Sequence, residues 1–423
     1  MLSVNFIKQN EKFVVERLKI KNFDASTLVK EILDVDSRKR DLQQKLEANQ
    51  AEMNSLSKQI GILFKDGKGE EANSMKSKTN ELKERVKEGN QQMVSLENEL
   101  NTLIIQLPNL PQESVPPGKS AEDNEILRGS MDKNTNNEGL LPHWELAKKY
   151  DIIDFELGNK ISGAGFPVYK GKGAKLQRAL VSFFLDEAIK AGYEEVNPPL
   201  LVNEDSGFGT GQLPDKEGQM YHIVNDNLYL IPTAEVPVTN IYRDSIMQAD
   251  DLPVKNTAYT PCFRREAGSY GKDVRGLNRL HQFDKVEIVQ ITHPDSSNRA
   301  HEEMINHVEG LLKKLGLTYR IVKLCGGDMS FTSALTYDFE VYSMAQQKWL
   351  EVSSVSNFET FQANRLKLRI REKGEKKNIP AHTLNGSALA LPRVVAALLE
   401  NNQTPEGIKL PEVLVSYTGY KYI

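Results

Sequence analysis

The chain has 423 residues, of which 39% are hydrophobic and 26% are charged, with 54 lysines and arginines against 58 aspartates and glutamates. This length excludes a single small module and, at roughly 150 residues per domain, predicts two or three structural units. The net charge of −4 excludes a chain-wide polycation, so any surface that binds nucleic acid must be local.

Cysteine content and the N-terminal residues indicate the compartment. The two cysteines, Cys262 and Cys325, are too few for a disulfide framework or a cysteine-rich metal site, and we interpret both as packing residues. Residues 1–20 carry charged side chains throughout, unlike a secretory signal. No window approaches the roughly 18 apolar residues of a membrane span. We therefore expect a soluble, cytoplasmic protein without a membrane partner.

Two segments near the N-terminus share a heptad-like spacing. From Leu28 to Ile60 apolar residues recur at alternating steps of four and three, and a second run continues from Met75 to Leu107. This spacing predicts two helices that bury a narrow seam. The polar, glycine-containing residues 65–69 between them predict a chain reversal, so the helices can pair as an antiparallel hairpin. At about 1.5 Å per residue, the arm would be on the order of 50 Å long.

After the arm the pattern changes twice. Prolines between 108 and 117 and the asparagine-rich residues 132–138 predict a linker over 108–139. From residue 140 onward, short strand patterns outnumber helical ones, which predicts an α+β domain (140–423) with a mainly antiparallel sheet flanked by helices. The expected helices are 175–191, 298–315 and 391–400, and the expected strands are 194–202, 228–231, 258–263, 285–291, 319–324, 339–342 and 349–354.

The common phosphate-binding motifs are absent. Neither the P-loop spacing nor the dinucleotide-binding glycine spacing occurs, and no zinc-like His/Cys spacing appears. Residues 207–211 are glycine-rich but lack the required spacing, so we interpret 207–214 as a mobile loop that bears on a site. Any nucleotide chemistry must therefore use side-chain cations.

Such cations cluster between 263 and 287. A strand pattern ends at Arg264 and Arg265, a loop follows with Arg275 and Arg279, and a second strand begins near Phe283. Guanidinium groups suit phosphate or carboxylate oxygens, and the aromatic ring could stack on a base. The alternative interpretation is a solvated basic hairpin.

The order of residues favours the first interpretation. The segment 263–287 resembles motif 2 of the class II aminoacyl-tRNA synthetases, and nearly the entire chain resembles the seryl-tRNA synthetase family. Pro198-Pro199 resembles motif 1, whose proline lies at a dimer interface. Asn385-Gly386-Ser387 leading to Arg393 resembles motif 3. The segments 233–235, 325–329, 337–341 and 351–358 resemble the family's serine signature and later core.

The resemblance implies an ATP site and a metal. Arg264 would hold the α-phosphate and the serine carboxylate, where charge builds during attack. Glu266 would contact the adenine amino group, Phe283 would stack on the ring, and Arg393 would hold the γ-phosphate side. Glu351 and Ser354 would ligate Mg²⁺ through hard oxygens. The catalytic residues are then Arg264 and Arg393, and the ATP-binding set also includes Arg265, Val352 and Ser353.

The resemblance also implies a serine pocket. Glu287 would accept a hydrogen bond from the substrate hydroxyl, and Thr233 and Glu235 would lie near the amino group of serine. Ala234, Asn385 and Ser387, with Arg264, complete the expected set. A site built to hydrogen-bond a hydroxyl rejects analogues that lack it by about 10⁴-fold or more. Taken alone, Glu235 and Glu287 would be interpreted as surface or paired strand carboxylates.

Motif 3 departs from the family pattern at two places. Ala388 and Pro392 stand where the family commonly has glycine. Both are compatible with a helix start near Leu391, because proline is tolerated in the first turn. The departures concern the local backbone and leave Arg393 unchanged.

The composition of the arm does not by itself indicate RNA binding. Residues 28–107 contain 13 Lys/Arg and 14 Asp/Glu, which would also suit a structural or protein-binding coiled coil. The resemblance implies instead that the arm lies along the variable arm of tRNA(Ser) and reads its shape and backbone. The candidate contacts are Arg38, Lys45, Lys76, Lys83 and Arg85.

The resemblance therefore implies a homodimeric serine–tRNA ligase. It would activate L-serine with ATP, release pyrophosphate, and transfer the seryl group to tRNA(Ser) and, where one exists, tRNA(Sec). One alternative is a synthetase-like ligase that loads a carrier protein, but relatives of that kind lack the long arm. Another is a non-catalytic scaffold, but Arg264, Glu266, Glu351 and Arg393 are all present.

Overall fold

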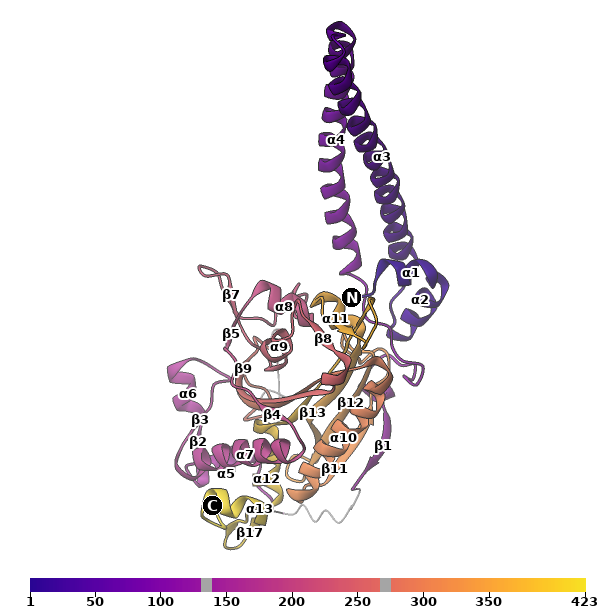
Figure 1. Ribbon diagram of the computed structural model, residues 1–423. Helices are drawn as coiled ribbons and strands as arrows, with labels where there is room; N and C mark the ends of the chain where they lie inside the picture. The colour runs from indigo at the N-terminus through magenta and orange to yellow at the C-terminus, as the bar shows by residue number, and fades with distance from the viewer. Residues whose placement is uncertain (131–138, 267–274) are drawn as a thin grey trace. The chain divides into compact units, whose positions relative to one another are not determined.

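The structure is a computed structural model that describes residues 1–130, 139–266 and 275–423 (Figure 1). The chain divides into two compact units. The first comprises residues 1–19 and 23–108, and the second comprises 20–22 and 109–423. Within the three described ranges, no helix has both the length and the apolar character needed to cross a membrane.

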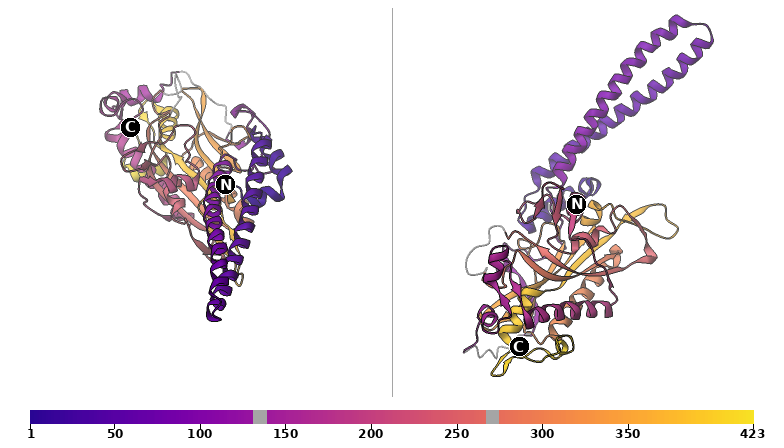
Figure 2. Two further views of the ribbon diagram at one scale, coloured as in Figure 1. Left: turned by 90° about the horizontal axis from the view of Figure 1, so that it is seen from above. Right: turned by 90° about the vertical axis from the view of Figure 1, so that its left-hand side faces the viewer.

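The first unit is helical. It contains the short helices α1 (Val4–Gln9) and α2 (Glu11–Leu18) and the long helices α3 (Ser26–Lys65) and α4 (Gly69–Ile104). The long helices lie side by side in every view (Figures 1 and 2), and the chain reverses at Gly67, whose φ is +71°. The predicted antiparallel hairpin is confirmed.

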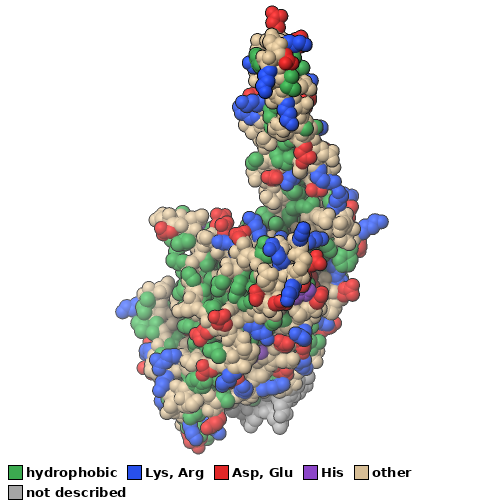
Figure 3. All heavy atoms as spheres, viewed as in Figure 1, with side chains coloured by type: hydrophobic (Ala, Val, Ile, Leu, Met, Phe, Trp, Pro, Cys, Tyr) green, Lys and Arg blue, Asp and Glu red, His purple; other side chains and the backbone are tan. Residues whose placement is uncertain are grey.

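Most buried residues of the hairpin belong to the predicted stripe, although Val29, Ala72 and Ile104 are buried outside it. Ile32, Val35 and Leu56 are buried on α3, and Leu82, Leu96 and Leu100 are buried on α4. Gly89 interrupts the apolar pattern for a steric reason, because a Cβ there would lie 2.5 Å from Leu46 Cδ2. Around the seam, basic and acidic side chains are both distributed over the arm surface drawn in Figure 3.

The second unit is built on an eight-stranded sheet with the order β1-β11-β12-β13-β16-β10-β9-β4. Neighbouring strands are antiparallel except β4 and β9, which are parallel. The predicted α+β fold is confirmed. The strands of this sheet are β1 (Glu125–Gly129), β4 (Glu194–Glu195), β9 (Val254–Phe263), β10 (Gln282–Thr292), β11 (Tyr319–Lys323), β12 (Leu335–Ser343), β13 (Lys348–Glu359) and β16 (His382–Ala390).

Short elements surround the sheet. The helices are α5 (His143–Lys149), α6 (Phe155–Ile161), α7 (Gly171–Lys190), α8 (Glu204–Thr210), α9 (Glu235–Asn240), α10 (Ser297–Lys314), α11 (Thr360–Arg365), α12 (Leu391–Asn401) and α13 (Glu412–Thr418). The remaining strands are β2 (Ile153–Asp154), β3 (Val168–Tyr169), β5 (Leu201–Asn203), β6 (His222–Ile223), β7 (Leu228–Leu230), β8 (Ile246–Gln248), β14 (Arg369–Arg371), β15 (Asn378–Pro380), β17 (Gln403–Thr404) and β18 (Gly407–Ile408).

The two faces of the sheet have different roles. Helices α7, α10 and α12 pack on one face in the main core, which includes Val286 and Ile288 of β10. Because side chains alternate along a strand, Lys285 and Glu287 lie on the other face. Directly paired residues of neighbouring strands share a face, so Ser387, opposite Glu287, joins them there. The polar residues predicted from the sequence thus gather on the face without these helices.

Four details differ from the sequence-based expectations. The strand predicted over 194–202 is two short strands, β4 and β5, which belong to different sheets, and the described residues 196–200 between them form no strand. Residues 207–210, expected in a mobile loop, form the end of α8, where a Cβ on Gly209 would lie 2.6 Å from Leu366 Cδ2. Asn385 and Ser387 lie within strand β16, which was not predicted as a strand. The stretch expected as a linker contains β1, which pairs with β11, while its asparagine-rich residues 132–138 lie outside the described residues.

Candidate active site

The β9–β10 hairpin positions the first group of predicted residues. Phe263 pairs with Gln282 at the end of the hairpin, and the backbone N–H of Arg264 donates to the His281 carbonyl at 2.9 Å. The guanidinium carbon of Arg264 lies 5.2 Å from the centre of the Phe283 ring, and its Nε donates to the Pro232 carbonyl at 3.3 Å. Arg264 is thereby tied to the residue that precedes Thr233.

The other residues at this end of the hairpin already have partners. The Glu266 carboxylate is 3.0 Å from Nη1 of Arg279, and the Arg265 guanidinium lies 5.7 Å from the Tyr221 ring centre. Residues 267–274 of the motif 2 segment lie outside the described residues. The carboxylate expected to contact adenine is therefore held by a neighbouring arginine in this structure.

A buried polar cluster surrounds Glu287. Thr233 Oγ1 donates to Glu287 Oε2 at 3.1 Å, Lys285 Nζ lies 2.6 Å from the same oxygen, and Lys285 also donates to Thr233 Oγ1 at 2.8 Å. All three residues are at most 5% exposed. A buried carboxylate requires a charged partner, and the ammonium supplies it. Sequence analysis did not include Lys285, although its position two residues before Glu287 puts it on the same face.

Glu235 lies next to this cluster at the start of α9. Its Oε1 accepts a hydrogen bond of 2.6 Å from Gln362 Nε2, and Gln362 is in turn held by the Thr210 carbonyl and the Thr383 hydroxyl. Burial, and then the nearby Glu287 carboxylate, raises the pKa of Glu235 to about 7. Ala234 packs in a small apolar cluster beside it. Gln362 was not predicted because no local pattern marks it.

Strand β13 and helix α12 supply the second group. Ser354 Oγ donates to Glu351 Oε1 at 3.3 Å, and Arg393 Nη1 donates to the Glu351 carbonyl at 2.7 Å. Helix α12 begins at Leu391 with Pro392 in its first turn, as expected. The side chain of Val352 packs in the main core, and the Ser353 hydroxyl donates to the Ser387 carbonyl. These last two side chains are used by the fold and do not join the polar group.

The two arginines reach the same end of the hairpin. Arg393 Nε donates to the Asn278 carbonyl at 3.0 Å, and Asn278 precedes by three residues the His281 that bonds the Arg264 backbone. Glu287 pairs across the sheet with Ser387, and Val289 pairs with Asn385. Residues far apart in the chain are therefore brought to one region of one sheet face.

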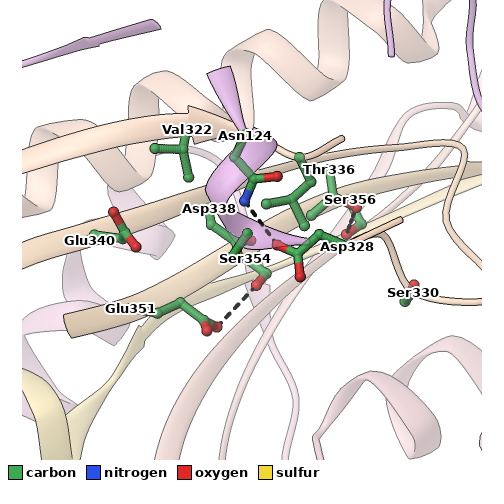
Figure 4. Close-up of a pocket in the computed structure, with 12 residues that line it drawn as sticks. Asn124, Val322, Asp328, Ser330, Thr336, Asp338, Glu340, Glu351, Ser354 and Ser356 are labelled. Atoms are coloured by element: carbon green, nitrogen blue, oxygen red, sulfur yellow. Dashed lines mark hydrogen bonds between the residues drawn. The ribbon is translucent and has the colours of Figure 1, made fainter. Parts of the chain in front are cut away.

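A cavity of about 330 Å³ is lined in part by Glu351 and Ser354 (Figure 4). Oxygen-bearing side chains dominate its lining, and they come from β12, β13 and the segments around 124 and 328. Burial, and then the Glu351 carboxylate, raises the pKa of Asp338 well above its ordinary value, and Asp338 Oδ1 has no hydrogen-bond partner. The lining residues with side-chain oxygens are Asn124, Asp328, Ser330, Thr336, Asp338, Glu340, Glu351, Ser354 and Ser356.

Comparison with known proteins defines the class. Residues 221–402 match the family described as tRNA synthetase class II core domain (G, H, P, S and T), and residues 1–111 match the family described as Seryl-tRNA synthetase N-terminal domain. The fold is that of a class II aminoacyl-tRNA synthetase, and the protein is an enzyme of that class.

Comparison with individual relatives shows to which family of this enzyme class the chain belongs. The serine–tRNA ligase of Salinibacter ruber is 50% identical over 424 residues, which cover 100% of this chain and 99% of that protein. The seryl-tRNA synthetase of Pyrococcus horikoshii, solved with ATP, is 32% identical with a TM-score of 0.92, covering 100% of this chain and 99% of that one. The cytoplasmic serine–tRNA ligase of Naegleria fowleri, solved with AMP, is 25% identical with a TM-score of 0.88, covering 100% and 98%. The chain belongs to the seryl-tRNA synthetase family, and the expected ligation of serine to tRNA is confirmed.

Proposed function

We propose that the protein activates L-serine with ATP at the Arg264–Arg393 site, forms seryl-adenylate and pyrophosphate, and transfers the seryl group to the 3′-terminal adenosine of tRNA(Ser). The convergence of Arg264, Phe283 and Arg393 at one end of the hairpin, beside the buried Glu287, carries the proposal. The ATP complex of the Pyrococcus horikoshii relative supports the choice of nucleotide.

Each cation then has a distinct task. Arg264 neutralises the negative charge that develops at the α-phosphorus when the serine carboxylate attacks, and it orients that carboxylate. Arg393 holds the γ-phosphate side of the leaving pyrophosphate. Glu266 turns from Arg279 to the adenine amino group, and Phe283 stacks on the ring. Arg265 and the backbone of Val352 and Ser353 complete the nucleotide contacts, because the side chains of the last two are used by the fold. Catalysis is positioning and charge neutralisation, with no covalent bond to the enzyme.

The carboxylates around the cavity fit a magnesium ion. Mg²⁺ prefers hard oxygen ligands and near-octahedral geometry, and Glu351 and Ser354 offer adjacent carboxylate and hydroxyl oxygens. The unpartnered Asp338 oxygen nearby marks a region where acidic side chains crowd together. When bound, Mg²⁺ would supply neutralisation of phosphate charge. The residues that would hold it are Glu351 and Ser354.

Serine is selected by the Glu287 cluster. Lys285 Nζ pairs with Glu287 Oε2 at 2.6 Å and holds the carboxylate in place, where it accepts a hydrogen bond from the substrate hydroxyl. Thr233 and Glu235 hold the amino group, and Ala234, Asn385 and Ser387 line the remaining pocket. Alanine and glycine lack the hydroxyl that donates to Glu287, and the loss of this hydrogen bond in a buried pocket costs binding.

The exchange of labelled pyrophosphate into ATP tests the first half-reaction without tRNA. We expect exchange with serine, and about 10⁴-fold lower kcat/KM with alanine or glycine because these lack the hydroxyl. Threonine tests whether the pocket has room for an extra methyl group. Equal exchange with alanine, or no exchange with any of the four amino acids, would contradict the proposed serine site.

The raised pKa of Glu235 predicts a pH-dependent serine affinity. Below about pH 7 the free enzyme carries Glu235 mainly protonated, whereas the ammonium of serine favours the ionised form. Binding is therefore strongest above this pKa and weakens as the pH falls. As the pH falls from 8 to 6, we expect the KM for serine to rise about tenfold. The variant Glu235→Gln should show a raised KM that is flat over this range, and a persisting pH dependence would assign the effect elsewhere.

We extend the proposal to the domains and partners. Residues 1–107 serve as the tRNA-binding domain, 108–139 as the linker, and 140–423 as the catalytic domain. The protein acts as a cytoplasmic homodimer and also serylates tRNA(Sec). Two features support dimerisation. Strand β4 is an edge strand of the eight-stranded sheet, and Leu201, a few residues after β4 in the chain, is an apolar side chain that is 40% exposed. A monomeric mass in sedimentation equilibrium at micromolar concentration would contradict the dimer.

A further inference from the structure

A buried histidine and a buried glutamate form a pair that the mechanism above does not use. His143, the first residue of α5, and Glu400, near the end of α12, both have fully buried side chains. His143 Nδ1 lies 2.6 Å from Glu400 Oε1, and the His143 backbone N–H donates to the same oxygen at 2.9 Å. Gln346 Nε2 donates to it at 2.9 Å, and the Ser343 hydroxyl donates to Oε2. So many donors indicate an ionised carboxylate.

The second nitrogen of His143 fixes the protonation of the ring. His143 Nε2 lies 2.8 Å from the backbone nitrogen of Leu277, and since that N–H can only donate, Nε2 must be the acceptor. The proton of the neutral imidazole is therefore on Nδ1, where it is donated to Glu400. Gly276 has a φ of +66°, and a Cβ there would lie 2.2 Å from His143 Nε2, so the glycine permits this close approach.

Leu277, whose backbone N–H donates to His143, is followed in the chain by the residue whose carbonyl binds Arg393. Asn278 follows Leu277, and its carbonyl accepts the 3.0 Å hydrogen bond from Arg393 Nε. The Asn278 side chain also donates to Gln346 Oε1 at 3.0 Å, which links it back to Glu400. Arg393 and Glu400 are seven residues apart on α12, close to two turns, so they lie on one face about 10 Å apart along the axis.

We propose that His143 is a positioning residue for pyrophosphate binding. Anchored by Glu400, it fixes the backbone of residues 276–278, and the Asn278 carbonyl in turn orients the Arg393 guanidinium. The inference rests on the proposed role of Arg393 in binding the ATP phosphates. It adds a residue that touches neither substrate nor nucleotide and that lies outside the motif 1, 2 and 3 segments.

Two amide substitutions separate the contact of His143 with Glu400 from its contact with Leu277. In His143→Asn the amide reaches the Nδ1 position and can still donate to Glu400, but it leaves the Leu277 N–H without a partner. In His143→Gln the longer side chain reaches the Nε2 position and can accept from Leu277. His307→Asn is the matched control, because it removes another largely buried histidine, on α10, whose Nε2 has no hydrogen-bond partner among the described residues and whose ring lies 5.8 Å from that of Tyr193.

Pyrophosphate exchange measured with each substrate varied tests the proposal. We expect His143→Asn to raise the KM for ATP about tenfold while the KM for serine stays within twofold, and His143→Gln to recover most of the loss. The Leu277 amide should exchange with deuterium at least about tenfold faster in His143→Asn than in the His307→Asn control. An unchanged KM for ATP in His143→Asn, or equal increases for both substrates, would overturn the proposal.

Two further variants keep the test decisive. If no His143 variant folds, Gln346→Leu removes the side-chain link between Asn278 and Glu400, together with a longer contact of 3.4 Å to His143 Nδ1. It should raise the KM for ATP about threefold without changing that for serine, and no change would overturn the proposal. Arg393→Ala separates this inference from the proposed function. If Arg393→Ala leaves the KM for ATP unchanged, the proposed role of Arg393 fails. If it raises that KM and His143→Asn does not, only the role of His143 fails.

Discussion

Replacement of Arg264 by alanine is expected to lower serine-dependent pyrophosphate exchange by about 10²–10³-fold, mainly in kcat. The guanidinium lies over Phe283 and is tied to the carbonyl of Pro232, so it is held in place before substrate arrives. Charge that develops only in the transition state benefits most from such a preorganised group. Removing it therefore affects the rate of the chemical step more than the binding of either substrate.

A conservative variant and a control variant test whether the loss of exchange is caused by the missing Arg264 guanidinium. Arg264→Lys keeps the charge but loses the planar fork, so we expect it to recover only part of the rate. Arg299→Ala removes an exposed arginine on α10, whose side chain is 79% exposed, and should leave exchange unchanged. If Arg264→Ala retained exchange within threefold of the parent protein, Arg264 could not have the proposed role.

Shortening the arm is expected to separate the two half-reactions. The hairpin can be cut where α3 and α4 touch, at Leu46 and Gly89, and closed with a short glycine-rich turn after residues 47–88 are removed. The buried base of the hairpin, including Ile32, Val35 and Leu100, is then retained. Pyrophosphate exchange should be unchanged, whereas tRNA charging should fall by on the order of 10²–10⁴-fold because one of two linked RNA contacts is lost.

The exchange activity of the shortened protein is its own folding control. Normal exchange with abolished charging would support the arm as the tRNA-binding element. Normal exchange with undiminished charging would refute that role. In the intact arm, Arg38 and Arg85 already form ion pairs with Glu99 and Glu81, so RNA phosphates would have to compete with these carboxylates. Charging should accordingly weaken as salt is added.

The sequence predicted the elements whose pattern is local. The seam of the arm follows a spacing that few structures other than paired helices satisfy. Most of its buried positions belong to the predicted stripe, whereas Val29, Ala72 and Ile104 are buried outside it. The hairpin around Arg264 was predicted because two apolar strand patterns flank one cluster of arginines. The family resemblance then supplied roles for residues such as Glu235, whose surroundings no local pattern describes.

The errors and omissions concern contacts between distant segments. The glycines of residues 207–210 predict a loop, but a Cβ on Gly209 would lie 2.6 Å from Leu366 Cδ2, so close packing rather than mobility explains the small residue. Gln362 reaches Glu235 across 127 positions of the chain. Lys285 shares a strand face with Glu287, but its contact with the distant Thr233 cannot be predicted from that spacing. Such contacts depend on topology, which strand patterns alone do not determine.

The most direct test of the account is a crystal structure of the protein with a non-hydrolysable ATP analogue and serine. The account predicts that Arg264 and Arg393 contact the same triphosphate, that Phe283 stacks on the adenine, and that the serine hydroxyl donates to Glu287. A triphosphate contacted by only one of the two arginines, or a serine hydroxyl directed away from Glu287, would contradict it.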